Sequence, residues 1–180
     1  MSDNNSIFQE VKGLYKILPL ESFRQTPGVH FDIIPLDVIP RIDGIDRVIH
    51  EGGAISPGSV GEVKRPWYMH TGQEDYLLVL GGTRYTDIYN VEHKQVERFE
   101  VAPNYIKKND KMFYEGAAML VWPCNVFHRI KSSDDTGSVS INFAVRNEKF
   151  DINNNFSIYD VNTDTDKYVV IREGHLDQKN

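Results

Sequence analysis

The chain has 180 residues, a formal net charge of −6 and a hydrophobic content of 40%. This length supports one domain with a sizeable core, and the composition is that of an ordinary globular protein. The 20 Lys and Arg residues are scattered along the chain and form no basic stripe, so we expect no nucleic-acid partner.

The N-terminal residues and the cysteine content predict a cytoplasmic location. The first ten residues, MSDNNSIFQE, lack the basic and apolar regions of a secretory signal, and nowhere do about 18 apolar residues run together. The single cysteine, Cys124, excludes an internal disulfide and gives no indication of an oxidising compartment. We therefore expect a cytoplasmic protein that has no membrane partner.

Residues 1–28 are predicted to form an N-terminal segment with one short helix. Apolar residues recur at helical spacing from Ile7 to Tyr15, and Ser6 is a potential N-cap. Gly13 weakens the helix. We expect this segment to pack on the body of the protein or on a partner subunit.

Residues 29–146 have the pattern of an all-β domain. Short runs of β-branched and aromatic residues recur between turn residues. The predicted strands are Val29–Pro35, Arg47–Ile55, Trp67–His70, Asp75–Leu80, Arg84–Asn90, Gln95–Val101, Ala117–Val121, Val126–Lys131 and Ser138–Arg146. A double-sheet jelly roll is the expected architecture, because closing the sheets also protects their edges.

Residues 147–180 have a different composition. Asn- and Asp-rich stretches are typical of loops, and Tyr168–Arg172 is one further strand candidate. We expect an extended C-terminal tail that packs on the barrel or on a partner subunit.

Two segments carry residue types that bind metals. His70 and Glu74 are four positions apart, on either side of Thr71-Gly72-Gln73, and His128 lies in a later strand. On one straight strand, the side chains of His70 and Glu74 would be about 13 Å apart, which is too far to share an ion. A chain reversal at Gly72 would bring them together. Two imidazoles and one carboxylate would then form a divalent-metal site.

The first of these segments resembles the first motif of the cupin superfamily, G-x5-H-x-H-x3/4-E-x6-G. The spacing His70-x3-Glu74-x6-Gly81 fits its second half. Tyr68 stands where the motif has its first histidine, and the upstream glycine, Gly61, is one residue too far away.

The later segment is similar to the second cupin motif, G-x5-P-x-G-x2-H-x3-N. The spacing from Pro123 to His128 fits, whereas Asn125 replaces the glycine and the interval from Gly116 to Pro123 is one residue longer. No asparagine follows at the expected place. The resemblance covers residues 45–146 and implies a double-stranded β-helix, or jelly-roll barrel, that forms homodimers.

The resemblance also implies a metal centre of His70, Glu74 and His128. Such a facial triad leaves about three positions open on the ion, which suits Fe(II) best and also admits Mn, Ni, Co or Zn. Open positions let a small-molecule substrate or dioxygen reach the metal. The alternative is that both histidines belong to the core and that Glu74 pairs with an arginine such as Arg84.

Tyr68 and Arg84 are the candidate catalytic residues beside the metal. Tyr68 precedes His70 by two positions and shares its strand face, so its phenol could be a fourth ligand, a hydrogen-bond donor, a proton donor or a filler of the barrel. Arg84 could point inward and bind an anionic substrate group, although a shift of one residue in register would turn it outward.

Three functions are compatible with these residues. The first is a metal-dependent cupin enzyme that acts on a small oxygen-bearing molecule, as a dioxygenase or oxidase or as a Lewis-acid isomerase or lyase. The second is a non-catalytic barrel that binds or senses a small ligand, with a structural or lost metal. The third, metal-free epimerisation of a sugar nucleotide, would require a His–Asp pair and a basic phosphate pocket, and neither is evident from the sequence.

Overall fold

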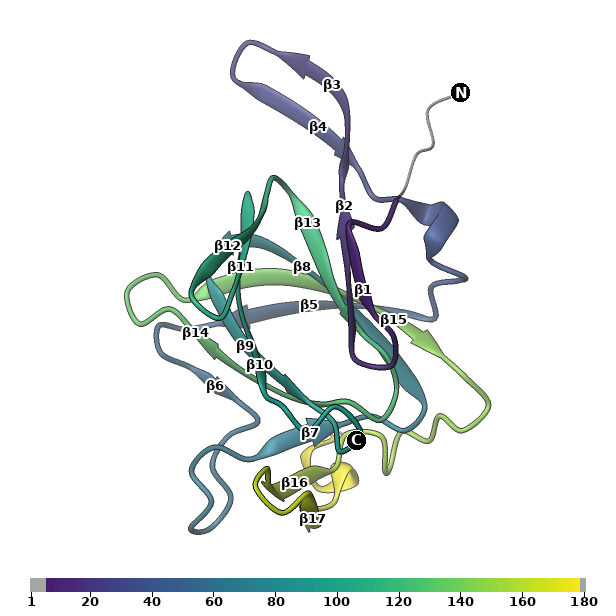
Figure 1. The fold of residues 1–180 in the computed structure, drawn as a ribbon, viewed down its shortest axis with the longest axis vertical. Helices are drawn as coiled ribbons and strands as arrows, with labels where there is room; N and C mark the ends of the chain where they lie inside the picture. Colours follow the sequence, from purple (N-terminus) through teal and green to yellow (C-terminus); the bar gives the residue numbers. More distant parts are fainter. Residues whose placement is uncertain (1–5, 179–180) are drawn as a thin grey trace.

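The computed structural model describes residues 6–178, which form two large antiparallel sheets and a separate hairpin (Figure 1). The six-stranded sheet has the order β1-β2-β13-β8-β15-β5, with the bounds Gln9–Val11, Tyr15–Pro19, Ala118–Trp122, Gln73–Gly82, Ser138–Arg146 and Gly44–His50.

The second sheet has the order β12-β11-β10-β9-β14-β7-β16-β17, and β6 pairs with β14. The bounds of these strands, in the same order and then for β6, are Lys111–Glu115, Tyr105–Lys108, Glu97–Ala102, Arg84–Tyr89, Phe127–Ser132, Trp67–Met69, Ile158–Asn162, Lys167–Arg172 and Ile55–Ser56. The projecting hairpin is made of β3 (Glu21–Thr26) and β4 (Val29–Ile33), and two short 3-10 helices, η1 and η2, span Leu36–Val38 and Gly174–Asp177.

The predicted N-terminal helix is wrong for residues 6–28, and residues 1–5 lie outside the described part of the chain. β1 and β2 form an antiparallel hairpin instead. Gly13 lies in its turn at a φ of 78°, a left-handed conformation that a right-handed helix cannot contain. β2 then pairs with β13, so Tyr15 and Ile17 enter the core as strand residues.

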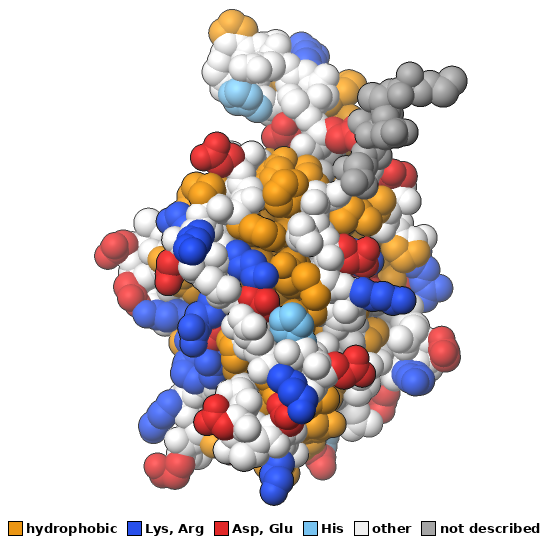
Figure 2. All heavy atoms as spheres, viewed as in Figure 1, with side chains coloured by type: hydrophobic (Ala, Val, Ile, Leu, Met, Phe, Trp, Pro, Cys, Tyr) orange, Lys and Arg blue, Asp and Glu red, His pale blue; other side chains and the backbone are white. Residues whose placement is uncertain are grey.

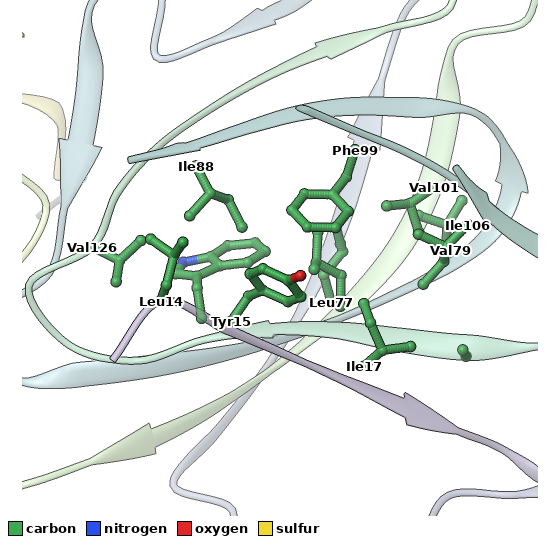
Figure 3. Close-up of a cluster of buried hydrophobic side chains, with 13 residues drawn as sticks. Leu14, Tyr15, Ile17, Leu77, Val79, Ile88, Phe99, Val101, Ile106 and Val126 are labelled. Carbon is green, nitrogen blue, oxygen red and sulfur yellow. The ribbon is translucent and has the colours of Figure 1, made fainter. Parts of the chain in front are cut away.

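The space between the sheets contains a cluster of buried hydrophobic side chains that both sheets contribute (Figure 3). Its members include Tyr15 and Ile17 of β2, Leu77 and Val79 of β8, Ile88 of β9, and Phe99 and Val101 of β10. Burying one side chain of this size stabilises the fold by about 1.5–3 kcal/mol. The cluster therefore fixes β8, the long central strand, against the opposite sheet.

The residues of β8 alternate between the two faces of its sheet. Leu77 and Val79 belong to the cluster between the sheets, whereas Tyr76 and Leu78 pack with a second cluster on the outer face. Since successive side chains of a strand point to opposite faces, the inward positions of β8 carry odd residue numbers as far as Val79.

The segment after Arg146 extends the second sheet. β16 pairs with β7, and β17 pairs with β16. The loop before β16 contains Asn155, which is 1% exposed. This loop therefore brings residues from the C-terminal segment against the barrel.

The surface offers no test of the predicted partners. Basic and acidic side chains are interspersed on the face shown in Figure 2, and hydrophobic side chains reach the surface below the β3–β4 hairpin. Within residues 6–178, no helix is long and apolar enough to cross a membrane. The cytoplasmic location, the homodimer and the absence of nucleic-acid and membrane partners stay predictions.

Candidate active site

His70 directly follows β7 and is held by a backbone carbonyl. Its Nδ1 lies 2.5 Å from the carbonyl oxygen of Asn155. A carbonyl only accepts hydrogen bonds, so Nδ1 carries the proton and donates it. The other ring nitrogen, Nε2, faces Oδ2 of Asp75 at 3.3 Å, and both side chains are buried.

Asp75 is the third residue of β8 and accepts hydrogen bonds from three side chains. Oδ1 accepts hydrogen bonds from Gln73 and Asn142, each at 2.8 Å, and Oδ2 accepts one from Trp122 at 3.1 Å. Burial alone would raise the pKa of Asp75, but the charge and hydrogen bond of His70, the charge of His128 and the hydrogen bond from Asn142 outweigh burial and hold that pKa below its ordinary value. Asp75 is therefore a rigid, charged carboxylate.

His128 is the second residue of β14 and lies beside His70, with 4.7 Å between the two ring centroids. Its Nδ1 donates to the carbonyl of Val126 at 3.2 Å. Burial, and then the charge of His70, lower the pKa of His128 to about 3. His128 is therefore neutral near pH 7, and its Nε2 is a lone-pair donor.

Glu74 is the member of the predicted triad that the structure places elsewhere. It lies on the outer face of β8, where it accepts a hydrogen bond from the hydroxyl of Tyr76 at 2.5 Å and lies 3.9 Å from the ammonium of Lys16. The expected reversal at Gly72 is instead a bend at residues 71–72, where the chain passes from β7 in one sheet to β8 in the other. β8 begins at Gln73, so the alternation turns Asp75 inward and Glu74 outward. Asp75 takes the predicted place of Glu74.

The resulting group of His70, Asp75 and His128 fits a divalent cation by its chemistry. One potential ligand atom from each residue lies within 4.8 Å of the others, and all three residues are buried. Each imidazole gives its Nδ1 proton to a backbone carbonyl, which is how metal-binding histidines are usually oriented. This donor set is shared by several metals, so nothing in it selects Fe(II) over Mn, Ni, Co or Zn.

Tyr68 lies close to both histidines, as expected from its position on β7. Its ring centroid is 6.1 Å from that of His70 and 6.0 Å from that of His128. Burial, and then the charge of Asp177, raise the pKa of Tyr68 above its ordinary value. The phenol is therefore protonated near pH 7 and is a donor beside the imidazoles.

A cavity of about 200 Å³ connects these residues with a second polar group. Tyr68, the two histidines and Asp75 line one part of it, and Arg84 lines another. Arg84 is 2% exposed, so the inward orientation considered for it from the sequence is the observed one.

Comparison with known proteins identifies the fold through structure alone. No protein-family model matches the chain, and no curated protein matches it in sequence. Solved structures do match: QdtA, a sugar 3,4-ketoisomerase from Thermoanaerobacterium thermosaccharolyticum in complex with TDP, has a TM-score of 0.53 at 13% identity over 89% of both chains. The chain has the cupin fold.

Two further structures share this cupin fold. One is a variant of QdtA in complex with TDP-4-keto-6-deoxyglucose, with a TM-score of 0.53 at 13% identity over 79% of this chain and 85% of the other. The second is dTDP-4-dehydrorhamnose 3,5-epimerase from Sulfolobus tokodaii, with a TM-score of 0.52 at 16% identity over 80% and 76%. The predicted cupin jelly roll is confirmed at the level of fold.

Sequence reasoning missed Asp75 and its supporting residues. Asp75 has a readable signal, because it is in phase with Leu77 and Val79, the apolar positions that face the other sheet. Asn155 has no such signal in the sequence, because its contact with His70 joins positions that are 85 residues apart.

Proposed function

We propose that this protein is an isomerase or epimerase of a carbonyl-bearing sugar, and that it moves a proton at a carbon next to the carbonyl group. The observation that carries the proposal is the buried His70–Asp75 pair, which lies in a cavity with a second, neutral histidine. The sugar 3,4-ketoisomerase and the 3,5-epimerase that share the fold add support from outside the chain.

The two contacts of His70 engage both of its ring nitrogens. Its Nδ1 proton is engaged by Asn155, so a neutral His70 would place an Nε2 lone pair against the Asp75 carboxylate. The contact is attractive when Nε2 is also protonated, because the imidazolium then donates to Asp75. Asp75 thus stabilises a positive charge on His70, as the carboxylate of a catalytic triad does for its histidine.

The two histidines can therefore divide the work of proton transfer. His128 is neutral, and its Nε2 lone pair can accept a proton from the carbon beside the carbonyl. The positive charge of His70 can stabilise the negative charge that develops on the carbonyl oxygen as the enediolate forms, without giving up a proton, because both of its N–H groups are engaged by Asn155 and Asp75. Return of the proton from His128 to the neighbouring carbon on the same face gives the shifted ketone. An epimer forms when water donates a proton to the same carbon on the other face and His128 releases its proton to water. Tyr68 adds a hydroxyl that can hydrogen-bond the substrate oxygens.

The cavity limits how much of the substrate lies inside. Its volume of about 200 Å³ is below the roughly 300–1,000 Å³ of sites for drug-sized ligands, so it accepts one monosaccharide-sized group. A neighbouring hollow of about 490 Å³ shares Tyr68 and contains Arg172. A nucleotide attached to the sugar would lie in that more open hollow.

Proton NMR of candidate substrates in D₂O tests this function. TDP-4-keto-6-deoxyglucose and related nucleotide-linked ketosugars are incubated with the wild type, His128→Gln and His70→Gln. We expect the wild type to form an isomer or epimer and to exchange a proton beside the ketone, and both variants to lose this activity. Unchanged substrates across the panel would contradict the proposal.

A metal-dependent cupin enzyme is the second candidate, favoured by the group of His70, Asp75 and His128 within 4.8 Å. These three residues would hold a divalent cation, which would act as a Lewis acid toward a substrate oxygen. Elemental analysis of purified protein tests this candidate. If it holds, a stoichiometric metal is lost in Asp75→Ala and kept in Glu74→Ala, which alters the neighbouring position on the outer face of β8. Protein that binds no metal after reconstitution, yet still turns over ketosugars, would exclude it.

A further inference from the structure

Arg84, the first residue of β9, is a buried cation that lacks a charged partner. Its Nε donates to the hydroxyl of Ser138 at 3.0 Å, and its Nη2 lies 3.5 Å from the carbonyl oxygen of Val48. Burial lowers the pKa of Arg84 to about 10, so the side chain still carries its charge near pH 7. No salt bridge within residues 6–178 includes it.

Two other arginines in the same sheet are paired. Arg129 of β14 bonds to Asp87 at 2.8 Å, and Arg172 of β17 bonds to Asp177 at 2.7 Å, although both arginines are more exposed than Arg84. Burying a cation without a countercharge is unfavourable, because the lost hydration is not replaced. An anion that enters the cavity would supply the missing countercharge to Arg84.

The surroundings of Arg84 consist of neutral hydrogen-bonding groups. Ser138 shares a hydrogen bond of 2.7 Å with Ser132, whose hydroxyl lies 3.1 Å from Nδ1 of His50. Burial, and then the charge of Arg84, lower the pKa of His50 to about 4, so this ring is neutral near pH 7. The cavity wall thus offers one cation, flanked by hydroxyl and imidazole groups that can adjust to an oxyanion.

The charge balance favours a monoanion over a phosphate. Arg84 is the only Lys or Arg among the described residues that line the cavity, whereas Asp46 and Asp75 line it as carboxylates. A phosphate dianion would require more positive charge than one guanidinium supplies. A carboxylate matches the single charge and also the two-pronged geometry of the guanidinium.

The distance along the barrel fits a small sugar. Arg84 is paired with Ser132 of β14, and His128 lies four residues earlier on the same strand and the same face. At about 3.3 Å per residue, these two positions are about 13 Å apart along the strand. Both residues line the same cavity of about 200 Å³, so a ligand of monosaccharide size can contact both of them.

We propose that the substrate carries a carboxylate, which Arg84 binds, while the carbonyl group lies at the His70 and His128 end of the cavity. The substrate class is an acidic sugar such as a uronate, or another small carboxylate that also bears a carbonyl. The position of the carbonyl rests on the proposed function, but carboxylate binding can be measured without turnover.

Calorimetry and thermal unfolding with matched ligands test the proposal. D-glucuronate and D-glucose differ only in the carboxylate, and inorganic phosphate tests the other anion. We expect glucuronate to bind the wild type and to raise its unfolding temperature, while glucose and phosphate have little effect. Arg84→Met should weaken glucuronate binding by about 10- to 100-fold, the value of losing charge-assisted hydrogen bonds.

Three further variants make the result decisive. Arg84→Lys replaces Arg84→Met as the test if Arg84→Met does not fold. It keeps the charge but not the two-pronged geometry, so it should retain only part of the glucuronate binding. Arg98→Met changes an exposed arginine on the neighbouring strand β10 and should bind like the wild type. His70→Gln should lose turnover and keep carboxylate binding, which separates this proposal from the proposed function. Equal binding of glucuronate and glucose, preference for phosphate, or full glucuronate affinity in Arg84→Met would overturn the carboxylate assignment.

Discussion

The two ends of the cavity each contain a buried charge, but only the charge at the histidine end has a charged partner in the protein. At the histidine end, the Asp75 carboxylate accepts hydrogen bonds from Gln73, Asn142 and Trp122 and faces His70. At the other end, the Arg84 guanidinium is bonded to a hydroxyl and, at 3.5 Å, to a carbonyl, both uncharged.

This difference indicates two kinds of task. A charge whose partners are all supplied by the protein is held in one position before any ligand arrives, which is what proton transfer requires. A buried charge without a partner is completed by the ligand and therefore contributes to recognition. Variants at the histidine end should thus reduce turnover, and variants at the arginine end should reduce affinity.

The largest effect is expected at Asp75. Asp75→Asn removes the countercharge of His70 and leaves the side-chain volume almost unchanged, so kcat should fall by about 10²–10⁴-fold. Glu74→Gln is the matched control on the outer face of β8, and its kcat should stay within about twofold of the wild type. Steady-state kinetics with circular dichroism of both variants checks this, and similar losses in the two would contradict the assigned register.

A smaller effect is expected at Tyr68, which lies beside both imidazoles and donates only a hydrogen bond in this account. Tyr68→Phe should lower kcat/KM by about three- to tenfold, the value of one neutral hydrogen bond. The same steady-state assay measures it. A loss as large as that of Asp75→Asn would instead make Tyr68 a principal proton donor.

The sequence predicted four residues of this cavity, because they lie in or beside strands with clear alternation. His70, His128, Tyr68 and Arg84 all line it, as the motifs and the strand pattern suggested. The error at Glu74 arose where the chain passes from one sheet to the other. A motif spacing does not tell which residue begins the next strand, and a shift of one residue exchanges the two faces.

Two other features could not be predicted by local pattern. The residues expected to form an N-terminal helix also fit a hairpin, and the pairing of β2 with β13 selects the hairpin. The carbonyl of Asn155 bonds to His70 from the C-terminal segment, so it depends on the path of the whole chain.

The smallest expected effect concerns acid stability at the arginine end. The pKa of His50 is lowered from 6.5 to about 4, so the unfolded chain binds its proton at a higher pH than the folded protein does. The folded state is therefore favoured above pH 6.5, and this contribution is lost as pH falls from 6.5 to about 4. Because His50 is only half-buried, we expect about 1–2 kcal/mol.

Urea unfolding between pH 7 and pH 4 measures this contribution. His50→Gln keeps a hydrogen-bonding group near Ser132 but does not titrate, so its free energy of unfolding should fall less on acidification than that of the wild type. An equal fall in both proteins would show that His50 is not the group responsible.

Deuterium incorporation by chelator-treated protein tests the central claim most directly. The wild type is stripped of metal and incubated in D₂O with a ketosugar that it converts, and mass spectrometry measures the deuterium at the carbon beside the ketone. If its own histidines and Asp75 carry the proton, the stripped wild type incorporates deuterium, and stripped His128→Gln and Asp75→Asn lose most of this exchange. Exchange that disappears on chelation and returns when a divalent metal is added would contradict the claim.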